Sequence, residues 1–282
     1  MLLPLMTQAH VVVTGGNTGI GFAAAKLFLS KGYQVTIVGR SKERLEVAQK
    51  ELGEVEVGIC DISSLESIEA FVNSTKNIDI LVNNAGVWLT KCQKSELGQE
   101  LTFATNHLGT MFLTVKLMEN NKLNEKASIV ILSSELHKKG VDDINYFDNL
   151  NASNFSGWNA YSQTKLYNLL FAYYLVKKYI PERYSAKQYK VASVHPGFIP
   201  TTEIARSENI FFRFLLKYIL PWMPMTTTVE DAAGRIFKAA TDADSNGKYI
   251  GNKGYEEPVS LASDESFSIG LWNKSSVILK LK

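Results

Sequence analysis

Thr14-Gly15-Gly16-Asn17-Thr18-Gly19-Ile20-Gly21 decides the fold, because it lies between a strand-like and a helix-like segment. The β-branched run 9–14 precedes it, and residues 19–31 follow with apolar side chains spaced for one buried helix face. Glycines at such a junction let backbone N–H groups approach a phosphate, and the helix N-terminus adds positive charge. A tight turn without a ligand is the alternative, since short glycine motifs often occur by chance. The stretch predicts a strand–turn–helix unit, with nucleotide binding as the first hypothesis.

Strand-like and helix-like segments alternate along the rest of the chain. We expect strands at 9–14, 33–39, 55–60, 78–83, 128–133 and 191–195, and helices at 19–31, 41–52, 63–74, 103–118 and 158–179. This alternation predicts parallel β-α-β units with right-handed crossovers. The strands are continuously apolar, which is typical of a sheet covered on both faces. We therefore predict an α/β fold: a single doubly wound, Rossmann-type domain over residues 1–282, with a parallel sheet of about seven strands.

The composition and charge of the chain argue against several classes of protein. The 282 residues are 45% hydrophobic and can bury a large core. The 30 basic and 28 acidic residues form no run of five like charges, so we expect no nucleic-acid partner. Two cysteines and four histidines, widely scattered, predict neither disulfides nor a metal site. Residues 1–6 are too few for a signal segment and no stretch reaches the ~18 apolar residues of a membrane span, so we expect a cytoplasmic location.

The second strand ends at Gly39-Arg40. Sites that prefer NAD usually carry Asp or Glu here, to hold the ribose 2′-hydroxyl. A guanidinium at Arg40 can instead pair with a 2′-phosphate, with Lys42 or Arg44 assisting. The alternative is a solvated charge at a helix start. The sequence favours NADP(H).

Tyr161 and Lys165 lie one helical turn apart on the same face of a predicted helix. A neighbouring ammonium stabilises a phenolate, but lowering a phenol pKa by ~3 units takes ~4 kcal/mol. That is much for one lysine, so we expect help from a positive nicotinamide. The same spacing recurs at Tyr173/Lys177, Tyr174/Lys178 and Tyr249/Lys253. Only Tyr161 opens a helix that follows a strand ending in serines, where active sites of open parallel sheets lie.

These motifs, with Asn83-Asn84-Ala85-Gly86 and Ser133-Ser134, resemble in their order the short-chain dehydrogenase/reductase family, in its single-domain branch, from about residue 9 to the C-terminus. Asn106-His107-Leu108-Gly109, Ser133-Ser134-Glu135-Leu136-His137 and the long interval to Tyr161 look most like its retinol dehydrogenase and WW-domain oxidoreductase group. The resemblance implies a catalytic tetrad of Asn106, Ser134, Tyr161 and Lys165. It also implies a cofactor-binding set, which is Gly15, Asn17, Thr18, Gly19, Ile20, Gly21, Arg40, Asp61, Ile62, Asn83, Ala85, Gly86, Tyr161, Lys165, Pro196, Gly197 and Thr201.

The resemblance also implies a separate role for each residue of the tetrad. Tyr161 exchanges a proton with the substrate oxygen as hydride moves to or from the nicotinamide. Lys165 lowers the phenol pKa and binds ribose hydroxyls. Ser134, chosen over Ser133 by the resemblance alone, orients the reacting oxygen, and Asn106 holds a water that relays protons. We assign His107 and His137 no catalytic role.

The segment after the Pro-Gly turn suggests the substrate. In the family it is a lid, here about residues 198–226, and residues 210–223 could form an apolar amphipathic helix. This favours an apolar carbonyl or alcohol, such as a retinoid, steroid, fatty aldehyde or aromatic ketone. Ordinary burial and a weak membrane contact through 210–223 are the alternatives. The helix 169–176 is apolar all round, so either a neighbouring helix or a second subunit, giving a homodimer, must cover it.

We therefore expect an NADP(H)-dependent carbonyl reductase or alcohol dehydrogenase. One alternative is a carbon–carbon double-bond reductase of the protochlorophyllide type, in which Tyr161 would protonate carbon. The other is an NADP-binding regulatory protein without turnover.

Overall fold

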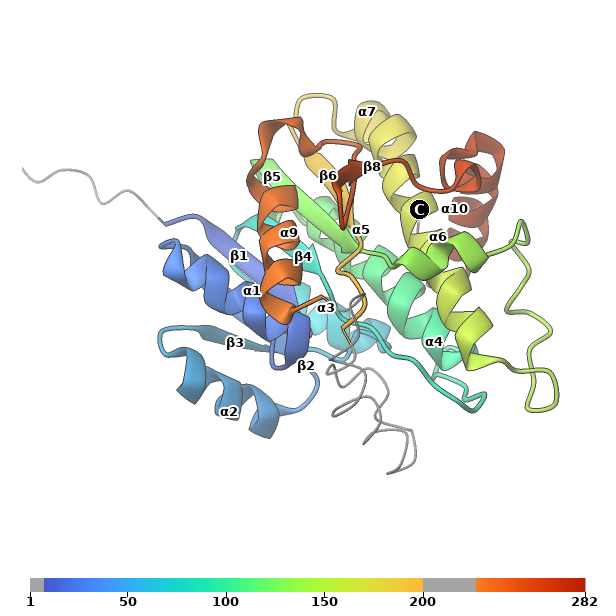
Figure 1. Ribbon diagram of the computed structural model, residues 1–282, viewed down its shortest axis with the longest axis horizontal. Coiled ribbons are helices and arrows are strands. Elements are labelled where there is room, and N and C mark those ends of the chain that lie inside the picture. Colours follow the sequence, from blue (N-terminus) through green and yellow to red (C-terminus); the bar gives the residue numbers. More distant parts are fainter. Residues whose placement is uncertain (1–7, 200–226, 282) are drawn as a thin grey trace, which may run out of the picture.

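A single sheet runs through the centre of the protein (Figure 1). The computed structural model describes residues 8–199 and 227–281. Within these ranges eight strands pair in the order β3-β2-β1-β4-β5-β6-β7-β8. The strands are β1 (His10–Thr14), β2 (Gln34–Gly39), β3 (Glu56–Ile59), β4 (Ile78–Asn83), β5 (Leu123–Leu132), β6 (Lys190–Val194), β7 (Tyr249–Gly251) and β8 (Gly254–Glu256). The predicted α/β fold is confirmed.

The described residues form eight strands, in agreement with the expected sheet of about seven. All pairs from β3 to β7 are parallel, but β7 turns back and pairs with β8 in the antiparallel sense. Gly254, with φ +93°, supplies the left-handed conformation of that tight turn. The added strand has three residues, too few to show a periodicity in the sequence.

Helices connect the parallel strands and cover the sheet. The α-helices are α1 (Gly19–Ser30), α2 (Lys42–Leu52), α3 (Leu65–Ser74), α4 (Leu101–Phe103), α5 (Thr110–Glu119), α6 (Gly157–Tyr174), α7 (Ile180–Arg183), α9 (Val229–Thr241) and α10 (Glu265–Leu279). Two segments are π-helical, η1 (Ala104–Gly109) and η3 (Leu175–Tyr179), and three are 3₁₀-helical, η2 (Glu135–Lys139), η7 (Ala243–Ser245) and η8 (Ser260–Ser263).

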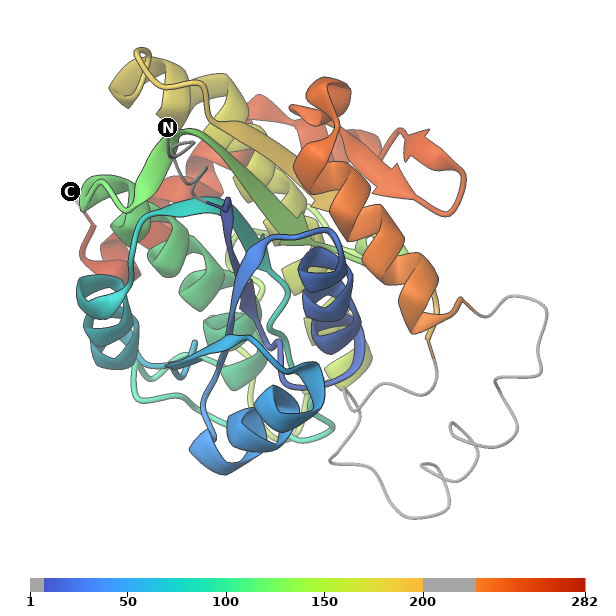
Figure 2. The same ribbon diagram turned by 90° about the vertical axis from the view of Figure 1, so that its left-hand side faces the viewer.

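Both faces of the sheet are buried, as continuously apolar strands require. Along β1, Val11 and Val13 point into the core beneath α1 and α9, whereas Val12 points into the core on the opposite face. Helices α1 and α9 lie side by side (Figure 2), where the rings of Phe28 and Phe237 have centroids 5.2 Å apart. The other face is covered by α3, α5 and α6.

Helix α10 packs against α6 from outside, away from the sheet (Figure 1). Trp272 stacks on Tyr174 with ring centroids 4.4 Å apart, and Leu170 and Leu175 are fully buried. Of the two covers that the sequence left open for the apolar helix 169–176, the structure provides the neighbouring helix.

The ends of the sheet position the site. The strand order reverses between β1 and β4, and open parallel sheets bind ligands at the carboxyl ends of strands beside such a reversal. The predicted lid 198–226 lies outside the described residues apart from Phe198 and Ile199. Where the described chain resumes, Thr227 N donates a 2.9 Å hydrogen bond to Phe198 O. None of the helices in residues 8–199 and 227–281 has the length and apolarity that crossing a bilayer demands.

Candidate active site

A cleft of about 630 Å³ opens at the carboxyl ends of β1, β2, β3 and β4. Its walls come from the glycine loop, from the residues that follow β2 and β3, and from the segment after β4. The lining residues are Gly15, Asn17, Thr18, Gly19, Ile20, Gly39, Arg40, Ser41, Arg44, Cys60, Asp61, Ile62, Asn84, Ala85, Gly86, Val87, Trp88, Leu89 and Thr105. Most of the cofactor residues predicted from the sequence therefore line one cavity.

The glycine loop has the shape of a phosphate cradle. Gly15 and Gly19 have φ values of +64° and +56°, which side chains rarely allow. A Cβ at Gly21 would lie 2.3 Å from Gly15 O, so this close approach needs glycine. Thr18, the N-cap of α1, makes no side-chain capping bond. The first N–H groups of α1 thus remain for an anion, which the helix dipole also favours.

Thr14 holds the glycine loop against the segment after β4. Its hydroxyl accepts hydrogen bonds from the backbone N–H groups of Asn84 and Ala85, both at 3.0 Å, and so ties β1 to the segment after β4. Asn84 completes the clamp by donating from Nδ2 to Thr14 O at 2.8 Å. The neighbouring Asn83 turns the other way and donates to Thr114 Oγ1 at 3.0 Å, outside the cleft lining. The sequence motif contains both asparagines, but only the structure shows that Asn84 faces the glycine loop.

Two arginines mark the far end of the cleft. Arg40 follows β2 and is exposed, and Arg44 reaches the same wall from the first turn of α2. Lys42, the other cation considered, instead lies 3.9 Å from Glu46 as an exposed ion pair along α2. Asp61 also lines this end, where its Oδ1 accepts from the Ser63 N–H at 2.9 Å and from the Ser63 hydroxyl at 2.7 Å. Of Lys42 and Arg44, only Arg44 lines the cleft.

Tyr161 and Lys165 lie in the first turns of α6. Lys165 Nζ is 5.2 Å from the centre of the Tyr161 ring and donates a 3.1 Å hydrogen bond to Leu132 O at the end of β5. Burial lowers the pKa of Lys165 from 10.5 to about 8. Burial also raises the pKa of Tyr161. The expected lowering of the phenol pKa by Lys165 is therefore absent in the protein alone, because desolvation of the phenolate outweighs a neighbour at this distance.

The structure separates the two serines that the sequence could not. Ser133 is buried, and its hydroxyl donates to Lys165 O at 2.8 Å, which anchors α6 to the end of β5. Ser134 is only partly buried, and its Oγ accepts a 3.3 Å hydrogen bond from Leu136 N. An accepting hydroxyl keeps its own proton free for another acceptor. Ser134 is the serine with a proton to offer.

Asn106 lies in the π-helical segment η1, a local widening that is frequent at functional sites. It is fully buried, and its amide pairs with both backbone groups of Val87, accepting from N at 2.7 Å and donating to O at 2.9 Å. Nδ2 also donates to Thr164 Oγ1 on α6 at 3.2 Å. The side chain thus fixes the cleft wall to the helix that carries Tyr161.

Gly86 joins the cleft to the titratable pair. A Cβ at this residue would lie 3.3 Å from Asn106 Oδ1 and 3.8 Å from Lys165 Nζ. Gly86, which lines the cleft, thus leaves room for no more than a side-chain carbon between its backbone and Lys165 Nζ. Asn106, Ser134, Tyr161 and Lys165 do not themselves line the cleft.

The Pro-Gly turn lies after β6. Gly197 has φ +99°, and Pro196 O accepts a 2.6 Å hydrogen bond from Arg235 Nη1 on α9. Thr201 lies outside the described residues. His107 packs between Asn168 and Ser275 of α6 and α10, and His137 bonds the backbone of Ser134 and Val259. Both histidines thus make packing contacts in the protein interior.

Comparisons with known proteins identify the family. The sequence pattern described as short chain dehydrogenase matches residues 9–147. Retinol dehydrogenase 14 of Homo sapiens is 32% identical, over 98% of this chain and 88% of that protein. The WW domain-containing oxidoreductase of Drosophila melanogaster is 28% identical, over 95% of this chain and 68% of that protein. A crystal structure of an uncharacterized protein from Mycobacterium paratuberculosis, 27% identical, superposes with a TM-score of 0.77 over 99% of this chain and 96% of that one.

The chain belongs to the short-chain dehydrogenase family. It is an oxidoreductase acting on alcohol or carbonyl groups, with a cofactor of the NAD(P)(H) type. The predicted family and its resemblance to the retinol dehydrogenase and WW-domain oxidoreductase group are confirmed.

Proposed function

We propose that this protein is an NADP(H)-dependent oxidoreductase that interconverts an apolar carbonyl compound and its alcohol. The proposal rests chiefly on the position of Gly86, which lines the cleft and has Asn106 and Lys165 as its neighbours on the far side. A nucleotide held in the cleft would end beside a phenol, an ammonium and a serine hydroxyl. Such a set suits the transfer of a proton to or from an oxygen atom.

The residues present fit a dinucleotide. The uncapped start of α1 and the glycine loop would hold the pyrophosphate, with Asp61 and Ile62 near the adenosine end. When bound, the cofactor supplies or accepts a hydride. Within the protein, Ser134 offers its proton to the substrate oxygen and Tyr161 holds the proton that this oxygen gains on reduction. Burial favours this neutral form of Tyr161, because it raises the phenol pKa.

Arg40 and Arg44 support NADP(H) over NAD(H), because two guanidinium groups at one end of the cleft suit a 2′-phosphate. We expect Arg40→Glu to weaken NADPH binding by about 10- to 100-fold, the size of a lost charge-assisted hydrogen bond, with little loss for NADH. The matched control is Lys42→Glu, which makes the same charge change on a residue outside the cleft lining. Titration of cofactor fluorescence measures both affinities. Equal losses in the two variants, or a wild type that prefers NADH, would contradict the assignment.

The contrast between the two serines gives a second prediction. Ser134→Ala should lower kcat by about 10²-fold or more, because a donor to the reacting oxygen is lost. Ser133→Ala should mainly lower the free energy of unfolding, by roughly 1 kcal/mol, since its hydroxyl serves Lys165 O. Steady-state kinetics and urea unfolding of both variants separate the effects. If Ser133→Ala is the catalytically dead variant, the roles are reversed.

The described residues also support an apolar substrate. Val87, Trp88 and Leu89 line the inner wall of the cleft, and the ring of Trp88 packs edge-on against Trp158, with centroids 5.9 Å apart, in the turn of α6 that precedes Tyr161. Trp158 and Phe198 each leave about half of their side-chain surface exposed, which an apolar ligand could cover. A panel of fatty, aromatic and retinoid aldehydes and ketones tests the class. Turnover confined to small polar carbonyls would overturn it.

A further inference from the structure

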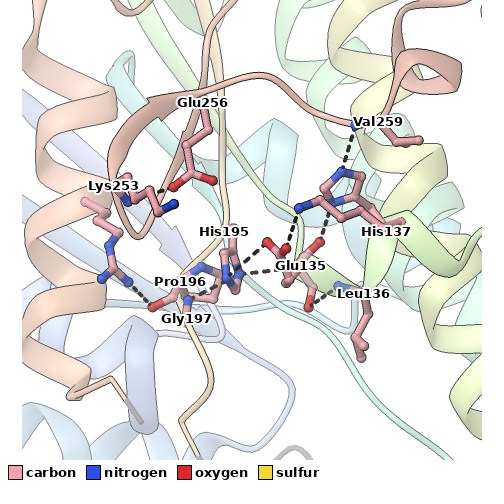
Figure 3. Close-up of polar contacts among 12 residues, drawn as sticks. Glu135, Leu136, His137, His195, Pro196, Gly197, Lys253, Glu256 and Val259 are labelled. Atoms are coloured by element: carbon pink, nitrogen blue, oxygen red, sulfur yellow. Dashed lines mark hydrogen bonds and ion pairs between the residues drawn. The ribbon is translucent and has the colours of Figure 1, made fainter. Parts of the chain in front are cut away.

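His195 lies where two loops of the candidate active site come together. It follows β6 and is buried, with 3% of its surface exposed. Its Nδ1 accepts one hydrogen bond from Glu135 N at 3.1 Å and another from Gly197 N at 3.2 Å (Figure 3). Glu135 directly follows Ser134, and Gly197 belongs to the Pro-Gly turn. One nitrogen atom thus connects the loops that leave β5 and β6.

The hydrogen bonds to His195 Nδ1 lie just beyond the carboxyl ends of β5 and β6. Between β5 and β6 the last backbone hydrogen bond toward the carboxyl ends runs from Ser133 N to Val194 O, at 2.8 Å. Beyond this bond the two strands lead into loops, and their ladder of backbone hydrogen bonds does not continue. His195 Nδ1 takes the place of a further backbone carbonyl, and it serves both loops at once.

Each loop has an outer anchor of its own. Pro196 O accepts from Arg235 on α9, at 2.6 Å. Ser134 O pairs with His137 Nδ1 at 2.6 Å, and His137 Nε2 in turn accepts from Val259 N at 3.1 Å. In Figure 3, Pro196 lies on one side of His195, and His137 and Val259 lie on the other. They hold each loop to the periphery, whereas His195 holds the loops to each other.

The ring must be neutral to do this. Both partners of Nδ1 are donors, so the single ring proton belongs on Nε2, which lies 3.7 Å from Glu135 Oε2. Burial lowers the pKa of His195 to about 4, with Arg235 and His137 acting in the same direction and Glu135 and Glu256 against it. The accepting nitrogen is therefore bare at neutral pH.

We infer that His195 is a positioning residue that sets the distance between the Ser134 loop and the Pro196–Gly197 turn. The inference rests on the proposed function, in which Ser134 orients the substrate oxygen, and on the predicted cofactor contact of Pro196 and Gly197. Hydride and proton transfer both depend on the relative placement of these two sides. A displacement of about 1 Å in such a site can lower the rate by about 10²-fold.

The test compares His195→Asn with His195→Leu in the full chain. Asn presents Oδ1 near the place of Nδ1 and can accept both hydrogen bonds, whereas Leu has a similar branched shape and no acceptor. The control is His10→Leu, which removes a buried histidine bonded to Asn77 O and Thr36 Oγ1 at the opposite end of the sheet. The readouts are amide hydrogen exchange of peptides that cover 133–136 and 196–198, the kcat, and the dissociation constant of NADPH.

We expect His195→Leu to speed amide exchange in both peptides by roughly tenfold, the equivalent of about one hydrogen bond. Its kcat should fall by about 10²-fold, with a smaller change in NADPH affinity. His195→Asn should restore both quantities to within a few-fold of the wild type. His10→Leu should lower thermal stability without changing exchange in these peptides or kcat.

The inference is overturned if His195→Leu exchanges and turns over as the wild type does, or if Asn and Leu are impaired alike. A wild type without any NAD(P)H-dependent turnover would contradict the proposed function instead. In that case the exchange experiment, which needs no substrate, still decides whether His195 joins the loops.

Discussion

Tyr161→Phe is expected to lower kcat by about 10²- to 10⁴-fold, the usual contribution of a general acid or base. The change removes one oxygen atom and leaves the ring beside Lys165 Nζ in place. Cofactor affinity should therefore stay within a few-fold of the wild type. Steady-state kinetics with the best carbonyl substrate, together with a fluorescence titration of NADPH, measure the two quantities.

The matched control for this variant is Tyr173→Phe. Tyr173 lies on the same helix and has the same spacing to a lysine, Lys177, but it is three turns farther along, at the end remote from the cleft. We expect the kcat of this control to be unchanged. Loss of turnover in both variants would mean that the hydroxyl at Tyr161 has no special role, and full activity in Tyr161→Phe would remove it from the chemistry.

Lys165→Met is expected to lower kcat by roughly 10²-fold and, at the same time, to stabilise the protein without cofactor. The ammonium is buried and makes no ion pair among the described residues, so its charge lowers the free energy of unfolding. A pKa lowered from 10.5 to about 8 corresponds to a gain of about 3 kcal/mol when the ammonium is removed. Leu132 O keeps a partner, because Asn168 Nδ2 also donates to it at 3.1 Å.

The sign of the pH dependence follows from the same shift. The folded chain releases the Lys165 proton near pH 8, and the unfolded chain releases it near 10.5. Between these values the unfolded chain binds more protons, so wild-type stability rises with pH relative to the variant. Urea unfolding at pH 7 and pH 10 should show the advantage of Lys165→Met shrinking as pH rises. A variant that is less stable at pH 7, or an advantage that is independent of pH, would contradict the account.

The fold could be predicted from the sequence where the residues of a short segment determine its backbone conformation. The run from Thr14 to Gly21 predicts a strand, a turn and a helix because its glycines allow the positive φ values that the turn needs at Gly15 and Gly19. The alternation of apolar segments then gave the parallel sheet. The edge strand β8 was missed, because three residues carry no period and its pairing depends on a turn at Gly254.

Much of the candidate site could also be predicted, since position after a strand places a residue at the ligand-binding edge. Arg40, Asp61 and Gly86 line the cleft for that reason. The direction in which a side chain points could not be predicted from its position after a strand. Ser133 and Ser134 are neighbours of the same type, and only packing against α6 shows that the hydroxyl of the first serves Lys165 O.

Contacts between distant segments were beyond the sequence for the same reason. His195 was predicted only as the end of a strand, and its two donors come from residues 60 positions before it and 2 positions after it. The cover of α6 by α10 joins segments almost a hundred residues apart. The phenol pKa depends on how deeply Tyr161 is buried, which the spacing to Lys165 does not reveal.

The most direct test of the central claim is the transfer of deuterium from NADPH deuterated at C4 to a panel of apolar aldehydes and ketones. We expect an alcohol with deuterium on the carbinol carbon, formed by the wild type and not by Tyr161→Phe. Deuterium on a carbon of a former double bond would instead identify a carbon–carbon reductase. Tight NADPH binding with no labelled product from any substrate would contradict the claim that this protein is a carbonyl and alcohol oxidoreductase.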